Sequence, residues 1–243
     1  MKVPYLFAVL LALSAPSFGA EPPQPANRYA ASIVPAERFE VGGMLVERHG
    51  QRGTPLILVP GLVSGAWVWQ DTLRRFAGEH VIYVVTLPGF DGRAPAPGKP
   101  MEAAQQALRE LIVSRKLAKP VLIGHSLGGT LAIALAEQEP DLVGGVVTID
   151  GLPVFPTTEG VPLAQRAQMA EGIKAPVLVI APYFDVDAEG AGITQDMKTG
   201  YYKSLMQGTP QVSVVAVSPA RHFAMFDQPQ QVADAIRAYL QSL

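Results

Sequence analysis

Residues 121–129 read VLIGHSLGG, and this stretch decides the fold. Its first three residues are an apolar run typical of a buried strand, and the residues from Leu127 onward are apolar nearly all round, as in a buried helix. Between them, residues 124–128 match the pattern G-x-S-x-G. So tight a turn strains the backbone of Ser126, and the flanking glycines remove side chains that would clash. The Ser126 hydroxyl is therefore predicted to project above a sheet, at the positive end of a helix.

Short apolar runs recur on both sides of this turn and alternate with helical patterns. Because most of them are apolar throughout, they are predicted to be strands that helices cover on both faces. The expected strands are residues 56–59, 81–86, 121–123, 146–149, 177–180 and 212–217, after a hairpin over 39–46. Helices are expected over 101–112 and 232–240. The alternation predicts an α/β fold with a mostly parallel, doubly wound sheet, whose carboxyl edge carries the functional residues.

Composition narrows the possible functions. The chain has 243 residues, enough for one domain with a substantial core. Its formal net charge of −2 favours neither nucleic acid nor an anionic membrane as an obligate partner. It contains no cysteine, so disulfides, thiol nucleophiles and thiolate metal sites are excluded.

The N-terminus has the features of a bacterial export signal. Lys2 precedes a short apolar run over residues 6–13, and small residues follow it. This pattern predicts a signal peptide over 1–20, a linker over 21–37 and one domain over 38–243, with a periplasmic or secreted location. A membrane anchor is the alternative, but the apolar run is too short to cross a bilayer comfortably.

A serine hydroxyl needs a base that takes its proton, and His222 is the predicted base. His222 follows the last expected strand and precedes the final helix, which puts it on the same sheet edge as Ser126. His125 lies inside the turn, with its side chain expected to point away from the nucleophile. His49 and His80 are expected at the surface.

A carboxylate must orient the base and stabilise its charged form. Asp185 follows its strand after a short loop and is the first choice. Asp187, two residues on, is the second candidate, and Asp150, at the end of the preceding strand, is the third. The order Ser126, Asp185, His222 is the one expected for this type of sheet.

Backbone N–H groups must stabilise the oxyanion that forms during acyl transfer. Leu127, directly after the nucleophile, is one predicted donor. Leu62 is the other predicted donor, because Gly61 lets the backbone of the loop after residues 56–59 come close to the oxyanion.

The substrate pocket is expected to be open or shallow. Residues 151–174 join two strands and hold at most one short helix, around 163–171, so they predict a small lid. Aromatic side chains are predicted to line an apolar acyl or alcohol site. They are Trp67, Phe155, Tyr183, Phe184 and Phe223.

Five stretches together resemble the α/β-hydrolase superfamily over residues 38–242. They are LILVPGL, VTLPGFDG, VLIGHSLGG, PVLVIAPYFD and ARHFAMFDQP, in the order of that family. The resemblance implies an eight-stranded fold, a triad of Ser126, Asp185 and His222, and no metal or organic cofactor. Ser126 excludes the aspartate nucleophile of the dehalogenase and epoxide-hydrolase relatives.

Two positions depart from the superfamily pattern. Pro60-Gly61 replaces the His-Gly of many relatives, a change that leaves the backbone donor in place. Thr86 stands where many relatives have aspartate, which leaves open what anchors the following loop.

These residues predict a serine hydrolase that cleaves a small-molecule carboxylic ester with a modest acyl group. Ser126 would be acylated, and water activated by His222 would then release the acid. Acyl transfer, amide hydrolysis and C–C bond cleavage by the same triad are the enzymatic alternatives. A catalytically silent binding protein of this fold is the alternative from another class.

Overall fold

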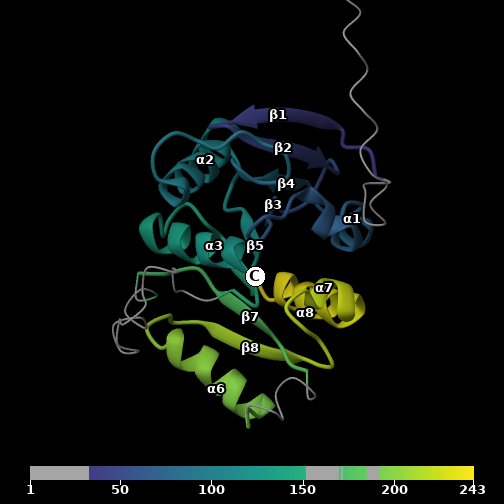
Figure 1. The fold of residues 1–243 in the computed structure, drawn as a ribbon, viewed down its shortest axis with the longest axis vertical. Coiled ribbons are helices and arrows are strands. Elements are labelled where there is room, and N and C mark those ends of the chain that lie inside the picture. Colours follow the sequence, from purple (N-terminus) through teal and green to yellow (C-terminus); the bar gives the residue numbers. More distant parts are fainter. Residues whose placement is uncertain (1–32, 152–169, 171, 185–191) are drawn as a thin grey trace, which may run out of the picture.

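The computed structural model describes residues 33–151, 170, 172–184 and 192–243 (Figure 1). One eight-stranded sheet runs through the molecule in the order β1-β2-β4-β3-β5-β6-β7-β8. The pairs β1–β2 and β2–β4 are antiparallel, and every other neighbouring pair is parallel. The predicted α/β fold with eight strands is confirmed. The predicted signal peptide, most of the linker and nearly all of the lid insert lie outside the described residues.

Strands β3 to β8 overlap the apolar runs of the sequence, and β1 and β2 form the predicted hairpin. The strands are β1 (Glu37–Val41), β2 (Met44–His49), β3 (Leu56–Val59), β4 (Ile82–Thr86), β5 (Val121–His125), β6 (Gly145–Ile149), β7 (Val177–Pro182) and β8 (Val212–Val217). Strands β3 to β7 are buried at every residue, as expected of strands with helices on both faces. Strand β8 lies at the edge of the sheet, and its exposure alternates along the strand.

Helices cover both faces of the sheet (Figure 1). On one face lie α2 (Pro100–Ser114), α3 (Leu127–Gln138) and α6 (Gln195–Leu205); on the other lie η1 (Ala66–Trp69), α1 (Gln70–Phe76), α7 (Ala224–Asp227) and α8 (Pro229–Gln241). Each face of the sheet therefore has its own hydrophobic core. In β3, for example, Ile57 packs in the core on the side of α2 and α3, and Leu58 packs in the core on the side of α1 and α8. Among the described residues, no helix has the length and apolar character needed to cross a membrane.

Glycines make the turn between β5 and α3 possible. A Cβ atom on Gly124 would lie 2.3 Å from the carbonyl carbon of Gly128, and one on Gly128 would lie 2.1 Å from the carbonyl oxygen of Val59. Ser126 has a φ of 51°, in the left-handed region that non-glycine residues avoid. The strained turn predicted from the G-x-S-x-G pattern is therefore present in the structure.

His49 lies in the interior, so the prediction that it is a surface residue is wrong. It is the last residue of β2, and only 3% of it is exposed. The reason is the position of β2 inside the sheet, between β1 and β4, where His49 pairs with Ile82. Its Nε2 atom lies 3.8 Å from Oε2 of Glu47, which is also buried.

We expect Gly128→Ala to lower the free energy of unfolding by about 3 kcal/mol, because the added methyl group overlaps backbone atoms that cannot move away. Gly78→Ala is the matched control, since a Cβ atom there has no neighbour within 4 Å among the described residues. The control should change stability by less than about 0.5 kcal/mol. Urea denaturation measures both values, and equal stability of the two variants would contradict the packing described for the turn.

Candidate functional site

The site lies at the carboxyl edge of the parallel strands. Ser126 directly follows β5 and Asp150 directly follows β6, so the two residues leave neighbouring strands at the same level. The N–H of Ser126 donates to the carbonyl oxygen of Ile149 at 2.9 Å, and the N–H of Asp150 donates to that of Ile180 at 3.0 Å. Asp150 also has a positive φ, of 50°. Backbone hydrogen bonds thus hold both residues in conformations that strand and helix residues do not adopt.

His222 reaches this edge from the loop after β8. Its Nδ1 atom lies 2.7 Å from Oδ2 of Asp150. The imidazole is about half exposed, whereas the Asp150 side chain is 15% exposed. A carboxylate at Nδ1 holds the proton of the neutral ring on that nitrogen, which leaves Nε2 unprotonated as a base.

The structure pairs His222 with Asp150, the third of the three acids considered from the sequence. Asp185 and Asp187 lie outside the described residues, and their place as the catalytic acid stays a prediction. Two further donors reach the other oxygen of Asp150: the hydroxyl of Tyr202 lies 2.5 Å from Oδ1, and Nζ of Lys198 lies 3.4 Å from it.

These contacts keep Asp150 ionised. Burial opposes the charged form, but the hydrogen bonds from His222 and Tyr202 and the charge of Lys198 outweigh it, so the pKa of Asp150 lies below its usual value. The hydroxyl of Tyr202 stays protonated, because burial and the neighbouring carboxylate raise its pKa far above the usual value.

Lys198 and Tyr202 were not found by the sequence analysis. The signal available was their spacing of four residues in the segment between β7 and β8, which places both on one face of a helix. Nothing in the sequence alone indicated that this face turns toward a carboxylate.

His125 supports the loop that carries His222. Its Nε2 atom lies 2.9 Å from the carbonyl oxygen of His222, and its ring centroid lies 4.6 Å from those of His222 and Phe223. Burial lowers the pKa of His125 to about 4, so the ring is neutral at neutral pH. A carbonyl oxygen can only accept a hydrogen bond, so the neutral His125 ring carries its proton on Nε2, which acts as the donor.

The predicted oxyanion loop lies against Ser126. A Cβ atom on Gly61 would be 2.9 Å from Nδ1 of His125 and 3.2 Å from Cβ of Ser126, so glycine at this position lets the loop pack closely against both residues. Leu62 follows in the same loop, and Leu127 begins α3. Within the described part of the chain, neither of their N–H groups is used in a hydrogen bond.

Thr86 helps to anchor this loop. Its Oγ1 atom accepts a hydrogen bond from the N–H of Ala66, at 3.3 Å, at the start of η1. The carboxylate of Asp91 also packs against the loop, because a Cβ atom on Gly65 would lie 2.0 Å from its Oδ2. The hydroxyl thus supplies an anchor at the position where many relatives have aspartate.

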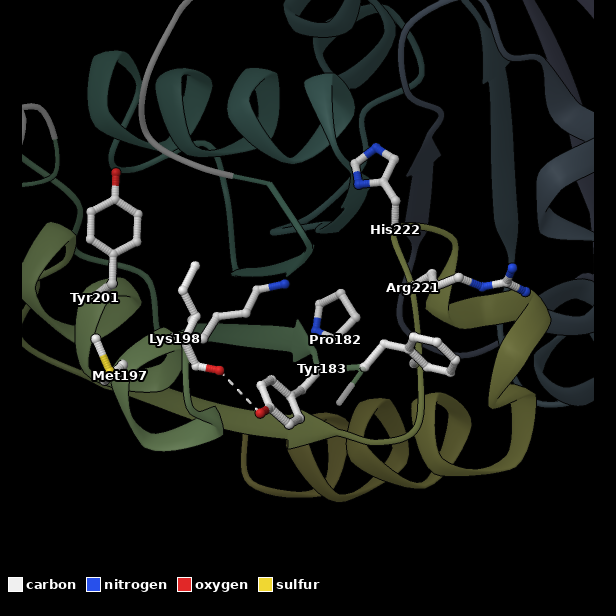
Figure 2. A pocket seen from close by; sticks show the side chains of 10 residues that line it. Pro182, Tyr183, Met197, Lys198, Tyr201, Arg221 and His222 are labelled. Carbon is white, nitrogen blue, oxygen red and sulfur yellow. Dashed lines mark hydrogen bonds between the residues drawn. The ribbon is translucent and has the colours of Figure 1, made fainter. Parts of the chain in front are cut away.

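A pocket of about 500 Å³ opens beside His222 (Figure 2). Its walls are mostly apolar and come from the end of β7, from α6 and from the loop after β8; they include Tyr183, Phe184, Ile193, Met197, Tyr201 and His222. The hydroxyl of Tyr183 donates to the carbonyl oxygen of Ile193 at 3.1 Å, which joins two walls.

The aromatic residues predicted for the pocket fall into two groups. Tyr183 and Phe184 line it. Trp67 and Phe223 instead stack on Phe226, at centroid distances of 6.1 and 5.4 Å, next to His125. Phe155 lies outside the described residues. In the part of the chain that the structure describes, no three His, Asp or Glu side chains form a group that could hold a metal ion.

A family model described as "Alpha/beta hydrolase family" matches residues 56–197. Among curated proteins, the chain is 30% identical over 116 residues to a pimeloyl-[acyl-carrier protein] methyl ester esterase of Pectobacterium carotovorum (48% of this chain, 44% of that protein). It is 33% identical over 122 residues to a 2-succinyl-6-hydroxy-2,4-cyclohexadiene-1-carboxylate synthase of Escherichia coli (50% and 46%). The matches thus span less than half the length of these relatives.

The fold is also similar to that of solved structures. An esterase from Thermogutta terrifontis superposes with a TM-score of 0.67, covering 85% of this chain and 99% of that one at 21% identity. The similarity at this identity concerns the fold.

The low pKa of His125 makes folding stability depend on pH. Below pH 6.5 the unfolded chain binds a proton at this residue, whereas the folded chain does so only near pH 4. Folded-state stability therefore falls as the pH decreases through this window, by about 2 kcal/mol at pH 5. His125→Gln keeps a donor that does not titrate, so its stability should fall less between pH 7 and pH 5. Equal losses in wild type and variant, measured by urea denaturation, would contradict a buried neutral imidazole.

Proposed function

Because the chain belongs to the α/β-hydrolase family, we propose that it is a serine hydrolase that cleaves small carboxylic esters through an acyl-enzyme intermediate. The observation that carries this proposal is the hydrogen bond of 2.7 Å between His222 and Asp150 at the edge where Ser126 leaves β5. An imidazole oriented by a carboxylate, at the same sheet edge as a strained serine, supports activation of the serine hydroxyl group.

Asp150 is the acid in this proposal, in place of Asp185. Three observations support this choice. The Asp150 carboxylate is hydrogen-bonded to Nδ1 of His222, it is largely buried, and its pKa lies below the usual value. An ionised carboxylate in this position stabilises the imidazolium that forms during the reaction.

In the first half of the reaction, Oγ of Ser126 attacks the ester carbonyl carbon while Nε2 of His222 takes the hydroxyl proton. The carbonyl oxygen becomes an oxyanion, which the N–H groups of Leu62 and Leu127 stabilise. The C–O bond to the alcohol then breaks, and the alcohol leaves with the proton from Nε2. In the second half, water attacks the acyl carbon while Nε2 takes one of its protons. The bond between Oγ of Ser126 and the acyl carbon then breaks, Oγ takes the proton back from Nε2, and the acid is released.

The pocket beside His222 supports an ester with an apolar acyl or alcohol group. Its volume of about 500 Å³ suits a small molecule, and Tyr183, Phe184 and Met197 offer it apolar surface. The N-terminal segment supports a periplasmic or secreted location for the enzyme. The names of the curated relatives, an ester hydrolase and a synthase, are consistent with carbonyl chemistry on this fold.

Ser126→Ala should remove hydrolysis of short p-nitrophenyl esters, with kcat falling by about 10⁵-fold or more, because the nucleophile is lost. Wild type should release p-nitrophenol in a burst that matches the enzyme concentration when deacylation is slow. Ser114→Ala, on the exposed end of α2, is the matched control and should keep wild-type kinetics. Wild-type protein that hydrolyses no ester and does not react with an organophosphonate would contradict the proposal.

Asp150→Asn should lower kcat/KM by about 10³-fold or more, because the amide cannot stabilise the imidazolium and favours the wrong tautomer of His222. Asp185→Asn is the paired comparison and should stay within about threefold of wild type, as expected of a residue outside the catalytic machinery. The reverse result, an active Asp150→Asn and an inactive Asp185→Asn, would assign the acid to the loop after β7.

A further inference from the structure

Helix α6 directs two polar side chains at the same oxygen of Asp150. We infer that Lys198 and Tyr202 are positioning residues, which hold the Asp150 carboxylate in the orientation that His222 needs. This inference rests on the proposed function, since it concerns the reaction assigned there.

The two oxygens of the carboxylate have separate partners. Oδ2 contacts Nδ1 of His222 at 2.7 Å, whereas Oδ1 contacts the Tyr202 hydroxyl at 2.5 Å and Nζ of Lys198 at 3.4 Å. A carboxylate can rotate about the Cβ–Cγ bond, and such a rotation would break its hydrogen bond to the imidazole. Donors on Oδ1 oppose this rotation, so the imidazole keeps one partner in one orientation.

The helix is suited to this task. Lys198 and Tyr202 are four residues apart, which places them on one face of α6. Tyr202 is 3% exposed and packs into the core cluster that α6 shares with β7. Thr194 caps the helix by accepting a hydrogen bond from the N–H of Met197 at 3.1 Å. The Tyr202 hydroxyl is therefore held on a packed, capped element and not on a mobile side chain.

Helix α6 also borders the pocket. Met197, Lys198 and Tyr201 line it (Figure 2). Lys198 therefore reaches the carboxylate from the pocket wall, whereas Tyr202, which is 3% exposed, reaches it from the buried side of the helix.

A purely structural role is the competing explanation, in which Asp150 serves only as the hydrogen-bond acceptor for the buried Tyr202 hydroxyl. Tyr239 shows that a buried tyrosine hydroxyl can find hydrogen-bond partners without a catalytic group. It is 8% exposed, and its hydroxyl donates to the carbonyl oxygen of Pro176 at 2.6 Å and accepts from the N–H of Val146 at 2.9 Å. A backbone partner would serve Tyr202 equally well, so a structural role does not require the ammonium of Lys198 on the same oxygen.

Lys198 also sets the charge around the base. The titratable groups near Asp150 and His222 in the described residues are His125 on β5, Lys198 and Tyr202 on α6, and Arg221 in the loop after β8, which is paired with Asp227. His125 is neutral at neutral pH, so Lys198 is the charge that competes with a protonated His222 for the carboxylate. Lys198 therefore holds Oδ1 by its charge, beside the hydrogen bond from Tyr202.

The test uses two substitutions, each with a matched control. Tyr202→Phe should lower kcat on a p-nitrophenyl ester by about tenfold with KM within about twofold, because the carboxylate loses its hydroxyl donor but the packing remains. Lys198→Met should lower kcat by about threefold, because Oδ1 keeps the Tyr202 hydroxyl but loses the ammonium. The controls are Tyr239→Phe, at a buried tyrosine of α8, and Lys203→Met, at an exposed lysine of α6, and both should leave kcat and KM unchanged.

A second readout does not depend on activity. The Nδ1–H proton of His222, bonded to a carboxylate, should give a far-downfield ¹H NMR signal that disappears in Asp150→Asn. Tyr202→Phe should shift or broaden this signal, and Tyr239→Phe should not. Wild-type protein without esterase activity would refute the proposed function, and the NMR comparison would still test the inference. An unshifted signal in Tyr202→Phe, or an active wild type with a kcat that neither variant changes, would overturn the inference.

Discussion

The hydrogen bond between His222 and Asp150 is the interaction on which the site depends. It joins the loops after β6 and β8, which flank β7 in the sheet, so it forms only when all three strands are in register. The end of β7 fixes the loop that brings His222 across. The N–H of Tyr183 donates to the carbonyl oxygen of Val217 at 2.9 Å, and its carbonyl oxygen accepts from the N–H of Ala220 at 2.7 Å. The site is thus a product of the sheet and not of a local motif.

The residues of the candidate site are held in place by the surrounding backbone and packing. Ser126 and Asp150 both have positive φ, which costs free energy that the sheet contacts must offset. Gly124 and Gly128 let the turn, α3 and the end of β3 approach within distances that a Cβ atom would prevent, and Gly61 lets the loop after β3 pack closely against His125 and Ser126. His125 adds a hydrogen bond to the backbone of His222. Groups fixed in this way need little reorganisation when charge develops in the transition state.

The sequence predicted the fold and two of the three residues in the proposed triad for physical reasons. Runs such as residues 146–149 and 177–180 have no polar face, so they had to lie inside a doubly covered sheet, and the glycine pattern around Ser126 required a tight turn. The contact of His222 with Asp150 could not be derived, because three aspartates follow strands and side-chain reach across the sheet edge is not a local property. The burial of His49 was missed for a similar reason, since it depends on β2 lying between two other strands.

In the proposed reaction, the oxygen of Ser126 becomes nucleophilic because His222, oriented by Asp150, removes its proton. Covalent labelling by an organophosphonate, followed by peptide mass spectrometry between pH 5 and pH 8, reports both the labelled residue and the rate. A single adduct on Ser126 is expected, formed more slowly as the pH decreases and far more slowly in Asp150→Asn. An adduct on another residue, or a labelling rate that is independent of pH and unchanged in Asp150→Asn, would contradict the proposed reaction.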